Sequence, residues 1–232
     1  MNKNKLGVFL FFCLSMICIY SCKSDKPVEQ KINITPKKIT SPYSIQLDFD
    51  KIPFKYISDY GFFLGKLSDF IPNEKVLFYE PVSSLFSDKS HKSRFIWMPE
   101  NTSATIKKEA PYEFDYPNGT VIIKNFYYPK NFNNPQGEKQ VIETRLLIKK
   151  ENKWEAYPYL WNEEQTDAKY KITGTTLPVS FIDEKGKKHD INYIQPNKNQ
   201  CKSCHNKKEQ LLPIGPKARN LNFKLDYGNG IL

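Results

Sequence analysis

Long apolar runs are absent from this sequence of 232 residues, whose longest uncharged and mainly apolar stretch, Leu6–Tyr20, has fifteen. A helix that crosses a bilayer needs about 20 apolar residues, so this stretch is short for a membrane-spanning helix. The sequence also lacks a Gly-rich phosphate loop and a Ser nucleophile elbow, which excludes these nucleotide-binding and hydrolase motifs. No segment repeats at a period of about 20–50 residues, which excludes solenoids and propellers.

The N-terminal stretch has the charge pattern of an export signal. Lys3 and Lys5 precede the apolar run Leu6–Tyr20, as the positively charged start of a secretory signal peptide does. The run ends at residues 19–22 (IYSC), which resemble a bacterial lipobox. This resemblance implies cleavage immediately before Cys22 and lipidation of that cysteine; an ordinary signal peptide and an uncleaved anchor are the alternatives. We therefore expect an exported, membrane-anchored lipoprotein that faces the periplasm or the cell surface.

Cysteine is scarce, and its count of five is odd, which rules out a closed set of internal disulfides. Cys13 and Cys18 leave with the expected signal peptide, and Cys22 takes the lipid. Cys201 and Cys204 are then the cysteines that remain for chemistry in the processed chain.

Composition divides the chain into four segments. Residues 23–42 carry few large apolar side chains, three prolines and five lysines against two acids, which is typical of a flexible tether. A first edge strand through Ile32 and Ile34 is the alternative. We expect a signal peptide at 1–21, a lipidated cysteine and tether at 22–42, a β-rich domain at 43–196, and a short C-terminal segment at 197–232.

The expected β-rich domain consists of short apolar runs that Gly, Pro and Asn interrupt about every ten residues, a texture typical of antiparallel sheets and sandwiches. The runs predict strands at 120–128, 141–148, 154–161, 170–172, 177–182 and 190–194. A helical period is found only near Ile57–Leu67. We therefore predict a mainly β fold, with an antiparallel, sandwich-like body followed by the short C-terminal segment.

Residues 201–205 (CKSCH) hold the side chains that can carry chemistry. Two thiols separated by two residues can each form a thioether with one vinyl group of a haem. The adjacent histidine then lies against the porphyrin, where its imidazole can coordinate iron. An unprotected Cys-x-x-Cys pair in an exported protein tends to oxidise, so covalent attachment also suits the compartment. The motif predicts one haem c on Cys201 and Cys204, with His205 as the proximal iron ligand.

Three other sites share parts of this motif. A thioredoxin-like redox pair requires a βαβ context, which the β-rich texture before the motif does not provide. A structural zinc site needs four ligands, and the other histidines, His91 and His189, are isolated in the sequence. A structural disulfide is the simplest alternative, but it leaves His205 unexplained.

The remaining iron contacts are less defined. Gly215-Pro216 is similar to the Gly-Pro that follows the haem motif of small class I cytochromes c, where a proline carbonyl accepts a hydrogen bond from the proximal histidine. The resemblance implies this role for Pro216, with an ordinary turn proline as the alternative. No methionine follows His205, so Met98, His91 and His189 are the candidate distal ligands. An open or water-bound iron, or a ligand from another chain, is an equal alternative.

A wider resemblance covers most of the chain from about residue 57 to 223. The stretches that carry it are 59–63 (DYGFF), 81–88 (PVSSLFSD), 120–128 (TVIIKNFYY), 143–147 (ETRLL), 161–168 (WNEEQTDA), 200–205 (QCKSCH) and 213–222 (PIGPKARNLN). These stretches resemble a family of bacterial exported diheme c-type cytochromes, common among lipoproteins of the Bacteroidetes type. The resemblance implies a β-rich region followed by the first haem site. Family members continue to a second Cys-x-x-Cys-His, and this sequence ends before one, so we expect a one-haem short form or a truncated diheme protein.

The formal net charge of +10 is distributed unevenly. The signal carries +2, the tether +3 and residues 201–232 carry +4, which leaves +1 for residues 43–200. The nearly neutral body gives no support to a nucleic-acid footprint. The tether charge can lie against anionic headgroups. The C-terminal charge can pair with haem propionates or attract an acidic redox partner.

These observations predict an electron carrier or redox module rather than a stand-alone enzyme, with the haem supplying the chemistry and the protein tuning it. A haem enzyme with an open iron site, peroxidase-like in activity, is the second hypothesis. A haem-free β-sandwich interaction lipoprotein, with a Cys201–Cys204 disulfide, is the third.

Overall fold

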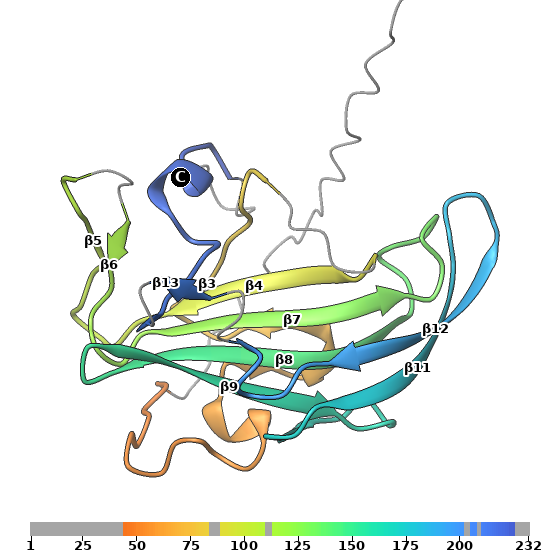
Figure 1. Cartoon of the computed structure of the whole chain (residues 1–232), viewed down its shortest axis with the longest axis horizontal. Coiled ribbons are helices and arrows are strands. Elements are labelled where there is room, and N and C mark those ends of the chain that lie inside the picture. The colour runs from red at the N-terminus through yellow and green to blue at the C-terminus, as the bar shows by residue number, and fades with distance from the viewer. Residues whose placement is uncertain (1–43, 84–88, 110–112, 202–204, 208–209, 226–232) are drawn as a thin grey trace, which may run out of the picture. The chain divides into compact units, whose positions relative to one another are not determined.

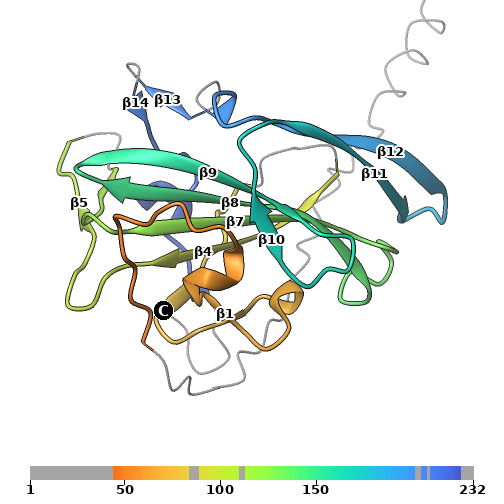
Figure 2. The ribbon, with the colours of Figure 1, turned by 90° about the horizontal axis from the view of Figure 1, so that it is seen from below.

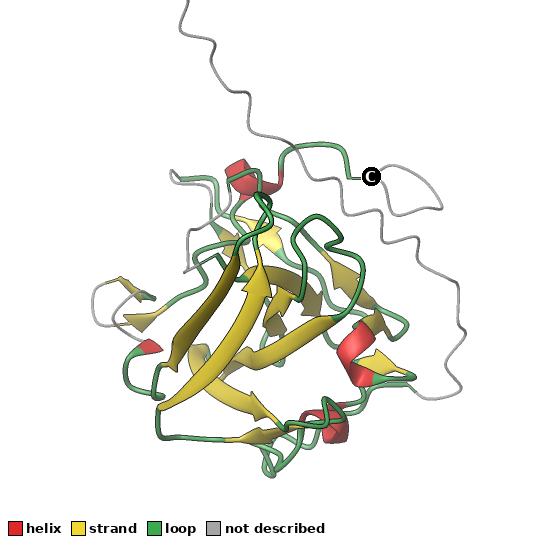
Figure 3. Cartoon of the chain, turned by 90° about the vertical axis from the view of Figure 1, so that its right-hand side faces the viewer, coloured by secondary structure: helices red, strands yellow, loops and turns green. Residues whose placement is uncertain are grey.

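The computed structural model describes residues 44–83, 89–109, 113–201, 205–207 and 210–225. Strands dominate these residues, and the helices are short (Figure 3). The sheets are antiparallel, so the predicted mainly β, antiparallel fold is confirmed. The expected signal peptide, the tether and Cys22 lie outside the described residues, as does Cys204.

A six-stranded sheet forms the body of the protein (Figure 1). Its strands are rich in β-branched and aromatic residues. The last four strands in the chain order pair with their neighbours in sequence, and two earlier strands pair with each other and extend the sheet at one edge. From one edge to the other, the strands are β10 (Ala168–Tyr170), β9 (Lys153–Trp161), β8 (Lys139–Lys150), β7 (Val121–Pro129), β4 (His91–Trp97) and β3 (Val76–Phe78).

Smaller elements surround this sheet. A long hairpin joins β11 (Thr175–Ile182) to β12 (Lys188–Gln195). Three short pairs follow the same antiparallel pattern: β1 (Phe63–Leu64) with β2 (Ile71–Pro72), β5 (Thr105–Ile106) with β6 (Phe114–Asp115), and β13 (Asn206–Lys207) with β14 (Gln210–Leu211). The short helices are η1 (Ile57–Tyr60), η2 (Leu67–Asp69) and α2 (Ala218–Leu221).

The helix suggested by the period at residues 57–67 is not formed. The chain makes only the single 3₁₀ turn η1, which Gly61 ends with a φ of 67°, and it then enters strand β1. A residue in the left-handed region stops a helix, and glycine adopts this region without a steric penalty. Ile57, Tyr60, Phe62 and Phe63 of this stretch still pack in one buried cluster against the sheet.

One face of the six-stranded sheet, here called the first face, is covered by residues 44–75. This segment, orange to yellow in Figures 1 and 2, lies on the opposite side of the sheet from the blue C-terminal residues. Phe95, Ile123 and Leu146 point into this layer from neighbouring strands and have no exposed surface. The buried members of this first-face core are Ile57, Tyr60, Phe62, Phe63, Phe70, Val76, Phe95, Trp97, Val121, Ile123, Tyr127, Val141, Leu146, Ile148, Tyr157, Tyr159, Trp161 and Ala168.

The second face carries two separate apolar clusters. The hairpin core, at one end, joins Tyr128, Phe132 and Ile142 to the β11–β12 side chains Val179, Phe181 and Tyr193. The C-terminal core, at the other end, joins the sheet to the C-terminal segment, and its buried members are Tyr79, Ile96, Tyr116, Ile122, Leu147, Trp154, Ala156 and Cys201.

A β-bulge shapes the second face. The register between β7 and β8 shifts at Phe126/Tyr127, so that Phe126 pairs with Glu143 but Tyr127 pairs with Val141. Ile142 is the extra residue, and an extra residue lets two consecutive side chains point to the same side. Ile142 packs in the hairpin core, and the Glu143 carboxylate accepts a hydrogen bond from Tyr193 of the same hairpin.

Candidate functional site

The first cysteine of the haem-like motif is part of the protein interior. Cys201 follows the β11–β12 hairpin and packs in the C-terminal core against the second face of the sheet. Its backbone carbonyl accepts a hydrogen bond from the amide of His205, 3.1 Å away. This hydrogen bond joins residues four positions apart, so Cys201 and His205 are the two ends of a single backbone turn. Cys204 lies outside the described residues.

The ring of His205 is oriented by the short hairpin that follows it. Strands β13 and β14 return the chain so that the amide of Leu212 donates to the carbonyl of His205 at 2.8 Å. In the opposite direction, Nδ1 of His205 lies 2.9 Å from the carbonyl oxygen of Leu212. A carbonyl oxygen can only accept, so Nδ1 carries a proton and donates it. In the neutral ring, Nε2 then holds a lone pair, which is the form that binds a metal ion.

This geometry corrects the role expected for Pro216. The carbonyl of Pro216 accepts a hydrogen bond from the Tyr116 hydroxyl at 3.2 Å, whereas His205 donates to Leu212. The reason is the β13–β14 hairpin, which brings the chain back beside His205 before it reaches Pro216. Leu212 is thus the residue that orients the histidine, and Pro216 holds Tyr116.

The surroundings of His205 favour its neutral form. Burial lowers the pKa of His205, and the positive charges of Lys124 and Arg145 lower it further, against the hydrogen bond to Leu212, which raises it. A neutral imidazole is the form required for coordination of a metal ion. The half-buried His205 is therefore in a tautomer whose Nε2 could coordinate a metal ion.

The three candidate distal ligands lie in different places. Met98 packs against the C-terminal core, the cluster that contains Cys201. His91 packs its ring against Phe132 of the hairpin core, with ring centroids 5.1 Å apart. His189 lies 2.6 Å from a carboxylate oxygen of Asp183 through its Nε2. Of the three, only Met98 shares a cluster with the motif.

A row of positive charge crosses the second face of the sheet between its two apolar clusters. Arg94 of β4 pairs in register with Lys124 of β7, which pairs in register with Arg145 of β8. We call these three residues the cation row. Side chains directly opposite each other on neighbouring strands point to the same face, with Cβ atoms about 5 Å apart. Arg94 is buried, and Lys124 and Arg145 are half-buried.

Only one end of the cation row has a carboxylate partner among the residues that the structure describes. The guanidinium of Arg145 forms an ion pair with Glu143, which also accepts a hydrogen bond from Tyr193. Burial acts against the charge of Arg145, but Glu143 outweighs it and raises the pKa of the guanidinium. Within the described ranges, neither Arg94 nor Lys124 forms a hydrogen bond or ion pair through its side chain; Lys124 lies over the Phe126 ring, 4.8 Å from its centroid.

Gln195 provides a second uncompensated polar group. It is only 1% exposed, and neither its amide nitrogen nor its amide oxygen has a hydrogen-bond partner in the described part of the chain. It lies two residues beyond Tyr193 on β12, so both side chains point to the same side of that strand. Tyr193 contacts Glu143 and Arg145, which places Gln195 on the side of the hairpin that covers the sheet.

The sequence alone did not single out the cation row. The one feature of the sequence that hints at the row is a charged residue in the middle of each apolar strand, such as Lys124 within the run Val121–Tyr128. Such a residue could point to solvent on an open face. Only the register of β4, β7 and β8 shows that the three charges line up on a covered face.

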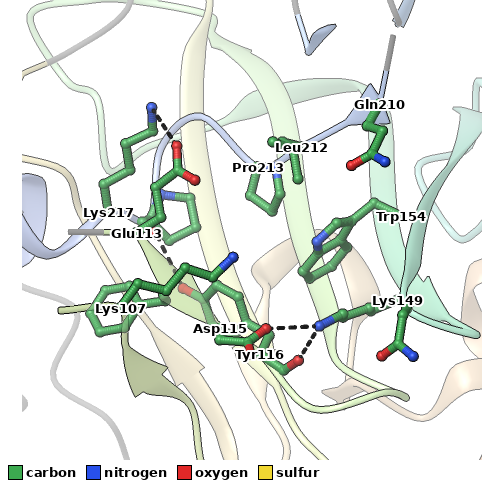
Figure 4. Close-up of a pocket in the computed structure, with 13 residues that line it drawn as sticks. Lys107, Glu113, Asp115, Tyr116, Lys149, Trp154, Gln210, Leu212, Pro213 and Lys217 are labelled. Atoms are coloured by element: carbon green, nitrogen blue, oxygen red, sulfur yellow. Dashed lines mark hydrogen bonds and ion pairs between the residues drawn. The ribbon is translucent and has the colours of Figure 1, made fainter. Parts of the chain in front are cut away.

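A cavity of about 220 Å³ lies beside the C-terminal segment (Figure 4). Two of its three lysines are paired: Lys149 contacts Asp115 at 3.1 Å and the carbonyl of Tyr116 at 2.6 Å, and Lys217 lies 3.9 Å from Glu113, whereas Lys107 is exposed. The cavity is smaller than the roughly 300–1,000 Å³ of typical ligand pockets, and neither Cys201 nor His205 lines it. We therefore do not assign it to a haem.

The described residues contain no cluster of three or more His, Cys, Asp or Glu side chains that could hold a metal ion by themselves. They also contain no helix with the length and apolar character needed to cross a membrane. Comparisons with protein-family models, curated proteins and solved structures found no match for this chain.

Proposed function

We propose that this chain is an exported, lipid-anchored c-type cytochrome-like protein that binds one covalent haem and transfers electrons. Cys201 and Cys204 would hold the haem through thioethers, and Nε2 of His205 would bind its iron. When bound, the haem supplies a one-electron couple between ferric and ferrous iron. The lipid on Cys22 would keep the protein at a membrane, where it exchanges electrons with a redox partner protein of acidic surface.

The hydrogen bond from His205 to Leu212 carries this proposal. A histidine that ligates a metal almost always donates its other ring N–H to a carbonyl or carboxylate, which fixes the tautomer and makes the ligating nitrogen more basic. His205 makes this bond at 2.9 Å, immediately after the two-cysteine motif. A histidine that only followed a structural disulfide would have no need of a fixed tautomer.

The surroundings of the motif also suit a haem. Cys201 borders an apolar cluster rich in aromatic and aliphatic side chains, which is the environment that a porphyrin face requires. The unpaired cations and the unpartnered Gln195 amide on the same side of the sheet are polar groups available to a ligand. The resemblance to exported diheme c-type cytochromes points the same way and remains part of the proposal.

Haem staining of the denatured protein tests this function. The full chain is produced in an exporting host that attaches haem to c-type cytochromes, together with the variants Cys204→Ala and Cys201→Ala. We expect a haem-stained band for the wild type, a weaker one for each single variant, and none for the double variant. A wild-type band without covalent haem would refute the function and leave a haem-free lipoprotein with a Cys201–Cys204 disulfide.

A peroxidase-like haem enzyme is the second candidate, and one observation favours it. His91 and His189 are engaged with Phe132 and Asp183, and Met98 is the one candidate distal ligand beside the C-terminal core. An iron without a sixth protein ligand would be open to peroxide. A six-coordinate, low-spin spectrum that does not change on addition of peroxide would exclude the enzyme and leave the electron carrier.

A further inference from the structure

We propose that the cation row of Arg94, Lys124 and Arg145 binds the propionate carboxylates of the haem. This inference rests on the proposed function, because it identifies the protein groups that hold the anionic edge of the cofactor. It is distinct from the charge of the C-terminal segment, which the sequence alone suggested as the propionate partner.

The register of the strands makes the row costly unless an anion binds it. Like charges directly opposite each other on neighbouring strands repel and destabilise a sheet. Here two such pairs, Arg94 with Lys124 and Lys124 with Arg145, share the central lysine. Burial and the charges of Arg94 and Arg145 lower the pKa of Lys124 to about 7. In the chain alone, the central lysine is thus at the edge of losing its proton.

The carboxylates of the described chain do not neutralise the row. Glu143 binds Arg145, at one end, and also Tyr193. Glu80 interacts electrostatically with Arg94 but forms no ion pair with it, and burial raises the pKa of Glu80. No described carboxylate forms an ion pair with Arg94 or Lys124, so within the described residues only Arg145 of the row has an ion-pair partner.

The position of the row relative to the motif identifies the anion. Ile122 and Leu147 pack with Cys201 in the C-terminal core, and they lie two residues from Lys124 and Arg145 on the same strands and the same face. The charges of Lys124 and Arg145 also act on His205, so the row lies next to the core that contains the motif's first cysteine. A haem fixed there by its vinyl groups and its iron still carries two carboxylates that need counter-charges. Arginine and lysine are suited to carboxylates, to which arginine can donate two parallel hydrogen bonds.

Two comparisons within the chain support this assignment. Around the 220 Å³ cavity, the two lysines that are not exposed, Lys149 and Lys217, each have a carboxylate of the chain within ion-pair distance, and the third, Lys107, is exposed. The protein thus compensates its covered cations at a place where no ligand is expected. The amide of Gln195 is buried without a partner on the covered side of the hairpin. A carboxylate could accept a hydrogen bond from this amide.

The midpoint potential of the haem tests the inference. We compare the wild type, Lys124→Met and the matched control Lys139→Met, using the haem-loaded full chain. Like Lys124, Lys139 is a partly buried lysine whose pKa is lowered by burial. It lies on β8, and its ammonium lies over the rings of Phe70 and Tyr127 in the first-face core. Lys124→Met should lower the potential, because loss of a nearby positive charge favours ferric over ferrous iron. We expect at least a tenfold change in the redox equilibrium, about 59 mV, and a much smaller change for Lys139→Met.

Further variants keep the test decisive. Lys124→Arg keeps the charge and should restore most of the wild-type potential, which a purely structural role would not predict. If Lys124→Met does not fold, Arg94→Gln must lower the potential in the same direction. Haem-loaded Lys124→Met with the same potential as Lys139→Met would overturn the inference and leave the proposed function intact. A wild-type chain without covalent haem would instead refute the proposed function, and this inference with it.

Discussion

The first face of the six-stranded sheet packs in one apolar core, whereas the second face carries two apolar clusters with the cation row between them. On the first face, residues 44–75 cover a continuous apolar core in which the Tyr60 and Tyr159 hydroxyls are hydrogen-bonded to each other. On the second face, two apolar clusters are separated by the cation row, and the buried Gln195 amide has no described partner. Both faces belong to the same strands, so the difference comes from alternate residues of one sequence.

This difference indicates that the first face of the sheet serves the stability of the fold, whereas the second face carries the groups that we propose for function. Buried polar groups are normally paired, and the first face obeys this rule. On the second face, the cation row lies between the hairpin core and the C-terminal core, and the latter contains Cys201, a residue that we assign to the haem. The protein thus keeps one side of the sheet for folding and leaves unpaired charge on the side that would meet a cofactor.

The largest contrast is expected between two neighbouring leucines of β8. Leu146 has no exposed surface and points into the first-face core, whereas Leu147 is 8% exposed and points into the C-terminal core. Buried Leu→Ala changes cost about 2–5 kcal/mol, and more where the surroundings cannot relax. In urea unfolding of the haem-free Cys201→Ala/Cys204→Ala chain, we expect Leu146→Ala to cost about 4 kcal/mol and Leu147→Ala about 2 kcal/mol. Equal costs would contradict the contrast.

A hydroxyl on each face gives the second contrast. The amide of Phe54 donates to the Tyr60 hydroxyl at 3.3 Å, Tyr60 donates to Tyr159 at 2.8 Å, and Tyr159 donates to the carbonyl of Phe54 at 2.8 Å. Tyr159→Phe breaks this closed ring of bonds and should cost about 2–3 kcal/mol, because buried groups lose their partners. On the second face, the hydroxyl of Tyr79 forms no hydrogen bond within the described ranges.

Tyr79→Phe is therefore the control for Tyr159→Phe, and it should change the free energy of unfolding by less than about 0.5 kcal/mol. Thermal or urea unfolding of both variants checks the pair. A Tyr79→Phe change as damaging as Tyr159→Phe would show that the hydroxyls of the two faces are equally engaged.

Lys124 should make the haem-free protein less stable at neutral pH than under mildly alkaline conditions. Burial and neighbouring charge lower its folded-state pKa to about 7 from the ordinary 10.5. Between these two values the unfolded chain binds more protons than the folded chain, so the free energy of unfolding rises with pH through this window. Replacing an uncompensated buried charge with an apolar side chain is stabilising, so Lys124→Met should add about 1–2 kcal/mol at pH 7.

Unfolding measured at several pH values tests both parts of this prediction. The rise between pH 7 and 10 should be smaller in Lys124→Met than in the parent chain. If Lys124→Met destabilises the haem-free protein, or if the pH dependence stays the same, the row is compensated by the chain itself and the contrast between the faces is lost.

The smallest effect is expected at Gln195. Its side-chain amide is buried without a described partner, and leaving such a group unpaired costs about 1–3 kcal/mol. Gln195→Met keeps a similar size and removes the polar atoms, so it should stabilise the haem-free chain by about 1 kcal/mol. A loss of stability on urea unfolding would show that the amide is satisfied in solution.

The strand content of the fold could be predicted from the sequence because β-branched and aromatic runs are interrupted by turn residues. The predicted run at 120–128 became β7 (Val121–Pro129), and 154–161 became β9 (Lys153–Trp161). The helical period at 57–67 misled, because apolar residues at that spacing also suit a 3₁₀ turn followed by a strand. The spacing of apolar residues indicates which side of a segment is buried, but at residues 57–67 it did not predict the backbone conformation.

The candidate site could be predicted only in part. Cys201 and His205 stand out by their spacing, which is local. The partner of the His205 ring is Leu212 and not Pro216, because the β13–β14 hairpin decides which carbonyl returns. The cation row depends on the register of strands far apart in the sequence. Pairing of this kind cannot be derived from one sequence, since a shift by one residue moves every side chain to the other face.

The most direct test of the central claim compares side chains on the two faces in the haem-loaded protein. Ile122 and Leu147 lie in the C-terminal core, while their chain neighbours Ile123 and Leu146 lie in the first-face core. Methyl resonances are recorded by NMR in the oxidised and the reduced protein. We predict that the Ile122 and Leu147 methyl signals shift more between the two states, because the proposed haem would place its paramagnetic iron on their side of the sheet. Equal shifts on both faces, larger shifts for Ile123 and Leu146, or no redox-dependent shift would contradict the account.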